Sequence, residues 1–220
     1  MGTLYLVPTP IGNLKDVTLR ALEILKEVDL ILAETPSKTL RLLNHYQIQK
    51  PVLPFFEGKN ERGLQKALQV LREGGKVAFT SEAGTPGISD PGQKLVATAR
   101  KEKVKIEALP GPSALCTALS LWGGPLKEVV FYGYLPKKRR KKVGERIKKD
   151  LCQGRVLVFF FSPYRLLKDL EFLEQCGAEG GLLLKELSKK FEEHLQGKLS
   201  DLRKALGKRE IKGEWTGLIK

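Results

Sequence analysis

The sequence predicts an α/β fold, and three observations carry this prediction. Short apolar segments of strand length alternate along residues 3–121 with segments whose apolar residues recur at helical spacing. The unit of strand, loop and helix occurs four times in this part of the chain, which is typical of a mostly parallel sheet. Several of the loops are rich in Gly and Pro, and ligands of open α/β sheets bind beyond the carboxyl ends of the strands.

Length, composition and charge narrow the class of protein. With 220 residues, 41% of them hydrophobic, the chain can form one large domain or two small ones. Its formal net charge of +14 favours a polyanionic partner. The chain has no apolar run of about 18 residues, and residues 1–10 lack the basic region of a signal peptide. We therefore expect a cytoplasmic protein with no membrane partner.

The cysteines and histidines give no sign of a metal site. Cys116, Cys152 and Cys176 have no ligand spacing, and we expect them to be reduced thiols. His45 and His194 are isolated in the sequence, which favours structural or solvated roles. The sequence therefore predicts no bound metal.

The expected elements of the first half follow in order. Apolar runs predict strands over 3–7, 29–33, 51–56, 77–79 and 105–109. Helical spacing predicts helices from about 18, over 38–45, 60–73 and 91–102, and to 121. In the helix from 18, the expected buried face consists of Leu19, Leu22, Leu25 and Val28. Asp90 and Pro91 are expected to start the helix over 91–102, as N-cap and first helical residue.

The second half repeats this alternation after a Gly/Pro stretch, Trp122–Pro125, which is a candidate domain boundary. Strands are expected over 129–134, 155–161, 181–186, 191–196 and 214–219. Helices are expected up to 152, from 163 and from about 200.

Three Gly/Pro loops that follow strands are the candidate ligand site: Pro8–Asn13, Ala83–Gly92 and Pro110–Ala114. Small residues let a backbone approach a ligand closely. None of the loops contains Lys or Arg, so a zwitterionic, nucleoside-like ligand suits them better than a bare phosphate. The chain also lacks the G-x-G-x-x-G, P-loop and G-x-S-x-G motifs.

Two long motifs and one short motif resemble a known family. Leu4–Leu14 reads L-Y-L-V-P-T-P-I-G-N-L, Ser81–Gly92 reads S-E-A-G-T-P-G-I-S-D-P-G, and Pro110–Ala114 reads P-G-P-S-A. They resemble the small-subunit rRNA 2′-O-methyltransferases that modify a cytidine, in the tetrapyrrole-methylase class of S-adenosylmethionine enzymes. The second motif has Glu82 where this family usually has Asp.

The resemblance implies two α/β domains of the tetrapyrrole-methylase type, 1–112 and 113–220, with the active site in the cleft between them. It also implies a homodimer and S-adenosyl-L-methionine as cofactor. The residues that it assigns to the cofactor are Pro10, Ala83, Gly84, Thr85, Ile88, Ser113, Ala114 and Leu218.

Other family motifs are altered on the side expected to bind the acceptor. Glu34–Ser37 reads E-T-P-S where the family usually has E-D-x-R, and Phe160–Arg165 reads F-F-S-P-Y-R where the family has Y-E-A-P-H-R, so that the Glu and the His are lost and the Arg remains. Lys185–Lys189 preserves the R-E-L-T-K pattern as K-E-L-S-K. The candidate catalytic residues are therefore Glu34 and Glu186 as general bases, with Lys185 or Arg165 orienting the nucleotide. A loop carboxylate that caps the next helix is an equally good interpretation of Glu34.

A run of six cations is the candidate RNA-binding segment: Lys137, Lys138, Arg139, Arg140, Lys141 and Lys142. It fits small-subunit rRNA or a 30S particle, although a charge run is often only a solvated loop. Tyr132 and Tyr134 precede it and could stack on a base.

Three functions therefore remain open. The first is 2′-O-methylation of a cytidine of small-subunit (16S) rRNA. The second is methylation of a tetrapyrrole precursor or another small molecule by an enzyme of the same class. The third is RNA binding without catalysis, by a relative that has lost acceptor-side residues.

Overall fold

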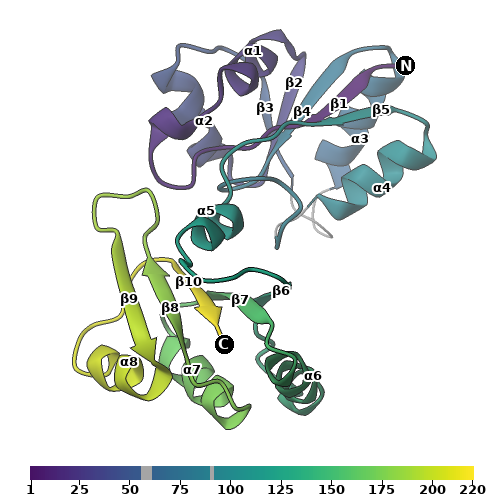
Figure 1. Cartoon of the computed structure of the whole chain (residues 1–220). Helices are drawn as coiled ribbons and strands as arrows, with labels where there is room; N and C mark the ends of the chain where they lie inside the picture. Colours follow the sequence, from purple (N-terminus) through teal and green to yellow (C-terminus); the bar gives the residue numbers. More distant parts are fainter. Residues whose placement is uncertain (56–60, 90–91) are drawn as a thin grey trace. The chain divides into compact units, whose positions relative to one another are not determined.

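The structure, a computed structural model, describes residues 1–55, 61–89 and 92–220 (Figure 1). The chain divides into two compact units, Met1–Ser113 and Ala114–Lys220. Trp122–Pro125, the candidate boundary, lies inside the second unit, because the helix that precedes it, α5 (Ala114–Ser120), packs against a strand of that unit. The predicted α/β class is confirmed, since each unit combines helices with a five-stranded sheet.

The first unit alternates strands and helices along the chain. Its strands are β1 (Thr3–Leu6), β2 (Leu30–Ala33), β3 (Val52–Pro54), β4 (Lys76–Thr80) and β5 (Lys105–Ala108). Its helices are the 3-10 turn η1 (Leu14–Asp16), α1 (Leu19–Glu27), α2 (Pro36–His45), α3 (Glu61–Arg72) and α4 (Gln93–Lys101). All the strand pairs are parallel, in the order β3-β2-β4-β1-β5.

Helices cover both faces of this sheet, so it is buried on both sides. On one face α1 and α2 pack on alternate strand residues such as Ile31 and Ala78. On the other face α3 and α4 pack on Leu32 and Phe79. Parallel sheets require such double cover, which explains the continuous apolar runs of these strands.

The predicted buried face of α1 is wrong at its first residue. Leu19 is 79% exposed, whereas Ala21, Ile24 and Leu25 are the buried residues of this helix. Thr18 is the N-cap, and its hydroxyl accepts a hydrogen bond from the Ala21 amide at 3.1 Å. Leu19 therefore lies in the first turn, on the opposite side of the helix from the face that contacts the sheet.

The order of the strands determines where three loops go. β4, β1 and β5 are adjacent and parallel, so their carboxyl ends lie side by side at one edge of the sheet. The loops Pro8–Asn13, Ala83–Gly92 and Pro110–Ala114 follow these three strands. The topology therefore brings together backbone segments that lie far apart in the sequence.

The second unit contains α5 and then five strands and three helices. The strands are β6 (Val129–Tyr134), β7 (Val156–Phe161), β8 (Gly180–Lys185), β9 (Glu193–Lys198) and β10 (Trp215–Ile219). The other helices are α6 (Arg140–Cys152), α7 (Leu166–Gln175) and α8 (Leu199–Leu206). The sheet is mixed, in the order β6-β7-β10-β8-β9, with β6 and β7 parallel and the other neighbours antiparallel.

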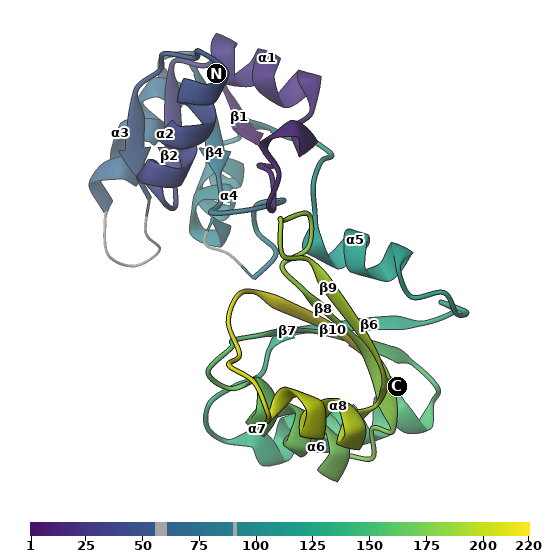
Figure 2. The same ribbon diagram turned by 90° about the vertical axis from the view of Figure 1, so that its left-hand side faces the viewer.

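One face of this sheet carries most of the core. α6, α7 and α8 bury Ile147, Leu170 and Leu202 against Phe159 and Leu183 of the sheet. Figure 2 shows these three helices together on one face and α5 on the other. Because β10 is the middle strand, its residues are buried from both sides.

Two expected helix starts differ from the structure. The helix expected from Pro91 begins at Gln93, after Gly92, which has a φ of 127°; the predicted N-cap Asp90 and its neighbour Pro91 lie outside the described residues. The helix expected from 163 begins at Leu166 because Ser162–Arg165 form a turn, in which the Arg165 amide donates to the Ser162 carbonyl at 3.0 Å.

Candidate active site

Three loops of the first unit meet around Gly84. The Thr9 and Gly84 backbones exchange two hydrogen bonds, at 3.0 and 2.9 Å, which join the loop after β1 to the loop after β4. The Thr85 hydroxyl donates to the Pro112 carbonyl at 3.0 Å, which joins the loop after β5 to the other two. The predicted meeting of these Gly/Pro loops is therefore present within one unit.

Gly84 is required at this junction for two physical reasons. Its φ is +78°, a left-handed conformation that side chains with a Cβ rarely adopt. An added Cβ would lie 3.2 Å from Cγ2 of Ile11 and 3.4 Å from the Pro112 carbonyl oxygen. The missing side chain therefore lets the three backbones approach one another closely.

Thr9 supplies a buried polar atom that the described residues leave without a hydrogen-bond partner. Its side chain is 5% exposed, and its hydroxyl has no hydrogen-bond partner among the described residues. A buried polar group without a partner is costly, and ligand binding is one explanation for its retention. The sequence prediction missed Thr9, although it lies in the first motif, between Pro8 and Pro10.

The expected cofactor residues divide between the two units. Pro10 lies in the first loop, and Ala83, Gly84, Thr85 and Ile88 lie in the second. Ser113 ends the first unit, and its Cα would lie 3.9 Å from a Cβ on Gly84. Ala114 and Leu218 belong to the second unit, where Ala114 starts α5 and Leu218 is fully buried on β10. The structure thus brings six of these eight residues into one set of loops.

These loops fit a nucleoside-like cofactor such as S-adenosylmethionine. Their close backbone packing at Gly84 and the unsatisfied Thr9 hydroxyl suit a ligand that is held by backbone groups and a neutral hydroxyl. Pro10, Ala83, Thr85, Ile88 and Ser113 are the residues that would surround it.

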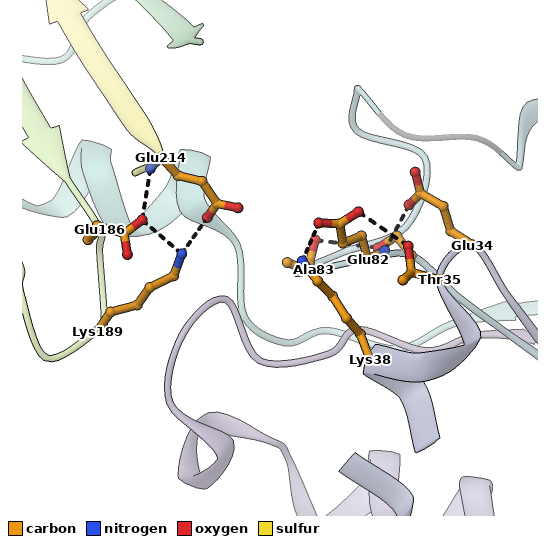
Figure 3. Close-up of polar contacts among 9 residues, drawn as sticks. Glu34, Thr35, Lys38, Glu82, Ala83, Glu186, Lys189 and Glu214 are labelled. Atoms are coloured by element: carbon orange, nitrogen blue, oxygen red, sulfur yellow. Dashed lines mark hydrogen bonds and ion pairs between the residues drawn. The ribbon is translucent and has the colours of Figure 1, made fainter. Parts of the chain in front are cut away.

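Glu34 supports the second loop. Its Oε2 accepts a hydrogen bond from the Glu82 amide at 2.8 Å (Figure 3). The Glu82 carboxylate in turn accepts from the Thr35 hydroxyl at 3.2 Å and forms an ion pair with Lys38. Thr35, the N-cap of α2, has no side-chain capping bond, and Glu34 binds the loop rather than the helix. The capping interpretation of Glu34 is therefore wrong.

A second polar cluster, in the second unit, contains Glu186 (Figure 3). Its Oε1 accepts from the Glu214 amide at 2.8 Å and from Lys189 at 3.0 Å, and Lys189 also reaches Glu214 at 2.8 Å. Burial tends to raise the pKa of Glu186, but these two donors outweigh it and the pKa lies below its usual value. Gly213, with a φ of +82°, makes room for this carboxylate, since a Cβ there would lie 2.7 Å from its Cγ.

Lys185 and Arg165 have structural partners. The Lys185 ammonium lies 3.8 Å from Glu193 and 5.9 Å from the ring centre of Trp215. Arg165 donates to the carbonyls of Leu135 and Pro136 at 3.2 and 3.3 Å. Both side chains therefore hold parts of the second unit in place.

Asp169 is the centre of a cluster that the sequence prediction missed. Its side chain is 4% exposed; it binds Arg165 at 3.1 Å and also pairs with Arg140. Arg140 donates to the Pro136 carbonyl at 2.8 Å, so both arginines hold the segment just before the cationic run. The spacing of four residues between Arg165 and Asp169 on a helix was the available signal.

The cationic run is not a single loop. Lys137–Arg139 lie in the connection after β6, with Arg139 at a φ of 56°, and α6 begins at Arg140. Arg140 is partly buried against Asp169 and lies over the Phe172 ring at 5.0 Å, so the other five cations form the exposed set. Among the described residues, none of these five forms an ion pair.

Tyr132 does not present its ring for base stacking. Its ring stacks on Phe159, with centres 5.2 Å apart, and its hydroxyl donates to Asp150. Burial and the neighbouring Asp150 carboxylate raise the pKa of Tyr132. Tyr134 is 58% exposed and remains a candidate.

The residues that the structure describes contain no group of three or more His, Cys, Asp or Glu side chains that could hold a metal ion. None of their helices has the length and apolar character needed to cross a membrane.

Comparison with known proteins identifies the family. The family model for Tetrapyrrole (Corrin/Porphyrin) Methylases matches residues 3–203. A Thermotoga maritima protein named ribosomal RNA small subunit methyltransferase I is 44% identical, over 100% of this chain and 98% of the relative. Proteins of the same name from Hydrogenobaculum and Halalkalibacterium halodurans are 39% and 40% identical, over 96% and 99% of this chain and 92% and 75% of the relatives.

Solved structures share the fold at low sequence identity. Cobalt precorrin-4 methyltransferase, a cobalamin biosynthetic enzyme, aligns with a TM-score of 0.74 at 17% identity, over 98% of this chain and 94% of the other. Uroporphyrin-III C-methyltransferase from Thermus thermophilus, complexed with S-adenyl homocysteine, aligns with a TM-score of 0.67 at 21% identity, over 99% and 97%. The family match and the full-length relatives show that the chain belongs to the tetrapyrrole methylase family of S-adenosylmethionine-dependent methyltransferases, together with the ribosomal RNA small subunit methyltransferase I proteins.

Proposed function

We propose that this chain transfers a methyl group from S-adenosylmethionine to the ribose 2′-oxygen of a cytidine in small-subunit rRNA. The observation that carries the proposal is the three-loop junction at Gly84 in a chain that is 44% identical over its full length to a ribosomal RNA small subunit methyltransferase I. The five exposed cations of 137–142 support a polyanionic acceptor. We also propose that the chain acts on the 30S particle, in the cytoplasm and as a homodimer.

The second function, methylation of a tetrapyrrole precursor, has weaker support. The tetrapyrrole enzymes named above share 17% and 21% of their residues with this chain, which shows the common fold alone. The relatives at 39–44% identity bear the ribosomal RNA name. A segment rich in exposed cations suits the repeated phosphates of RNA better than the few carboxylates of one small molecule.

The chain must provide a bound donor, a positioned acceptor and a route for one proton. When bound, S-adenosylmethionine supplies an electrophilic methyl group on its sulfonium. The loops around Gly84 would hold the donor by backbone contacts, and the exposed cations would hold the RNA backbone. Positioning of this kind supplies a large part of the acceleration of a two-substrate reaction.

Glu34 is the better of the two candidates for the base that removes the 2′-hydroxyl proton. A general base works best with a pKa near the working pH, and contributes about 10²–10⁴-fold. The pKa of Glu186 is lowered, because the Glu214 amide and Lys189 outweigh the effect of burial, and both of these donors contact its Oε1. The lowered pKa makes Glu186 the weaker base, which leaves Glu34, whose Oε2 accepts the hydrogen bond from the Glu82 amide.

The decisive experiment incubates the purified chain with methyl-labelled donor and either 30S particles, naked small-subunit rRNA or a tetrapyrrole precursor. The proposal expects label on a 2′-oxygen of one cytidine, located by nuclease digestion and mass spectrometry. Label on the tetrapyrrole but not on RNA would establish the second function. Donor and RNA binding without transfer would establish the third, non-catalytic function.

A further inference from the structure

The exposed aromatic side chains of the second unit gather at one end of its sheet. Among the described residues of the whole chain, the exposed aromatics are Tyr134, Tyr164 and Phe191. Tyr134 is the last residue of β6, Tyr164 follows β7, and Phe191 lies between β8 and β9. These three side chains, which are distant in sequence, therefore lie at or just after the carboxyl ends of β6, β7 and β8.

The strand register shows that these connections share one end of the sheet. Tyr134 pairs with Phe160, the next to last residue of β7. Trp215, the first residue of β10, pairs with Phe161 on one side and with Lys185 on the other. Since Phe161 and Lys185 are the last residues of β7 and β8, the connections that follow both strands emerge beside the start of β10.

Two of these aromatics are too exposed to be explained by packing. Tyr164 is 93% exposed and Phe191 is 69% exposed, and the only ring contact described for either is that of Lys190 with Phe191, at 5.6 Å. Exposed aromatic surface in a folded unit contributes little to its core, and clusters of such surface mark interaction sites.

The charges at this end favour an anionic partner. Several acidic side chains pair with neighbouring cations: Glu186 and Glu214 share Lys189, Glu193 pairs with Arg209, and Glu210 pairs with Lys212. Lys137, Lys138 and Arg139 are exposed, and within the described part of the chain they form no ion pair. The connection that carries these three cations begins directly after Tyr134.

The base of this surface is rigid. The buried Asp169 holds Arg140 and Arg165, and both arginines bind the Pro136 carbonyl at the start of the cationic connection. Tyr164 directly precedes Arg165, so the same cluster fixes the backbone beside this ring. A preorganised surface loses less conformational entropy on binding.

We propose that this end of the second unit is a platform for single-stranded RNA, on which Tyr164 and Phe191 stack unpaired bases while Lys137, Lys138 and Arg139 bind phosphates. The inference rests on the proposed function and specifies the form of its substrate. Exposed aromatic rings combined with cations are the usual means of binding single strands, whose bases are free to stack. In a duplex, the bases stack on one another and their faces are covered.

The test measures binding of a labelled single-stranded oligonucleotide of about 12 nucleotides, a length within the range of known single-strand sites, and of a duplex of the same length. The variants are Tyr164→Ala and Phe191→Ala, with Tyr164→Phe and Phe191→Tyr as conservative partners. Leu19→Ala, at an exposed apolar residue of the first unit, is the matched control.

Each alanine variant should bind the single strand about tenfold more weakly, as expected for one lost stacked base, and the conservative variants and Leu19→Ala should bind like the wild type. The duplex should bind all variants alike. The dependence of affinity on salt should be unchanged in the alanine variants, because stacking releases no counterions, and should become shallower when Lys137 and Lys138 are replaced by Ser.

Unchanged single-strand affinity in both alanine variants would overturn the inference. An equal loss for the duplex would also overturn it, as would a change from dimer to monomer in light scattering, which would assign the aromatics to a contact between copies of the chain. The proposed function is tested separately by wild-type transfer to rRNA. If transfer occurs but the alanine variants bind normally, only this inference fails; if the wild type neither binds nor methylates RNA, the proposed function fails.

Discussion

Replacing Gly84 with alanine would add one methyl group at the point where three loops of the first unit meet. The residue has a φ of +78°, and the added carbon would lie 3.2 Å from Cγ2 of Ile11 and 3.4 Å from the Pro112 carbonyl oxygen. Contacts this short force the neighbours to move by a few tenths of an ångström. Because two hydrogen bonds join Gly84 to Thr9, that movement is transmitted to the first loop.

The expected size of the effect follows from these two contributions. A left-handed backbone costs a residue with a Cβ roughly 1–2 kcal/mol, so Gly84→Ala should lower the free energy of unfolding of the first unit by about that amount. Displacement of the loops should also remove at least one hydrogen bond between the protein and S-adenosylmethionine. A net hydrogen bond is worth about 1 kcal/mol, so affinity for S-adenosylmethionine should fall about fivefold to tenfold.

Gly74→Ala is the matched control. Gly74 lies between α3 and β4 with a φ of +91°, and a Cβ there would have no neighbour within 4 Å. The Gly74→Ala variant should therefore lose about as much stability in urea denaturation as Gly84→Ala, but it should retain its affinity for S-adenosylmethionine in calorimetry. Wild-type donor affinity in Gly84→Ala, or an equal loss of affinity in both variants, would refute the assignment of this junction to the donor.

Three further predictions concern single side chains. Glu34→Gln keeps an oxygen for the Glu82 amide, so donor affinity should persist while turnover falls about 10²–10⁴-fold; unchanged turnover in a labelled-donor assay would exclude Glu34 as the base. Because the pKa of Glu186 is lowered in the folded chain, its ionised carboxylate stabilises the fold at pH values above the pKa of an unfolded Glu, about 4.3. This stabilisation is lost as the pH falls through the pKa of the folded state. Glu186→Gln should therefore flatten the fall in melting temperature below about pH 4.5, and an unaltered profile would contradict this. Asp169→Asn should cost about 3 kcal/mol in urea denaturation, because two arginines lose their buried partner; wild-type stability would remove Asp169 from this role.

Most elements could be predicted because their apolar periodicity is strong. The helix expected over 60–73 is α3, and its buried residues Leu64, Leu68 and Leu71 follow the expected spacing. Leu19 shows the limit of this signal. The first turn of α1 offers two overlapping apolar patterns, and the small residue Ala21, rather than Leu19, faces the sheet.

The site could be predicted in part, for a reason that lies in the topology. Gly and Pro mark loops that leave strands, and this pattern located the three loops. Their meeting depends on β4, β1 and β5 being neighbours, which no local pattern encodes. For the same reason the roles of Asp169 and of Thr9 were missed, since each depends on contacts or burial that only the folded chain defines.

Some residues at which this chain differs from the family motifs contact one another in the first unit. Glu82 stands where the resembling family usually has Asp, and Thr35 and Ser37 stand where that family has Asp and Arg. The longer Glu82 side chain contacts the Thr35 hydroxyl and Lys38, while Glu34 holds the Glu82 amide. The loop that would hold the donor is thus fixed from the carboxyl end of β2 by a carboxylate, a hydroxyl and an ammonium. Thr35 and Glu82, which stand at two of the altered positions, therefore contact each other in this chain and support the loop that would hold the donor.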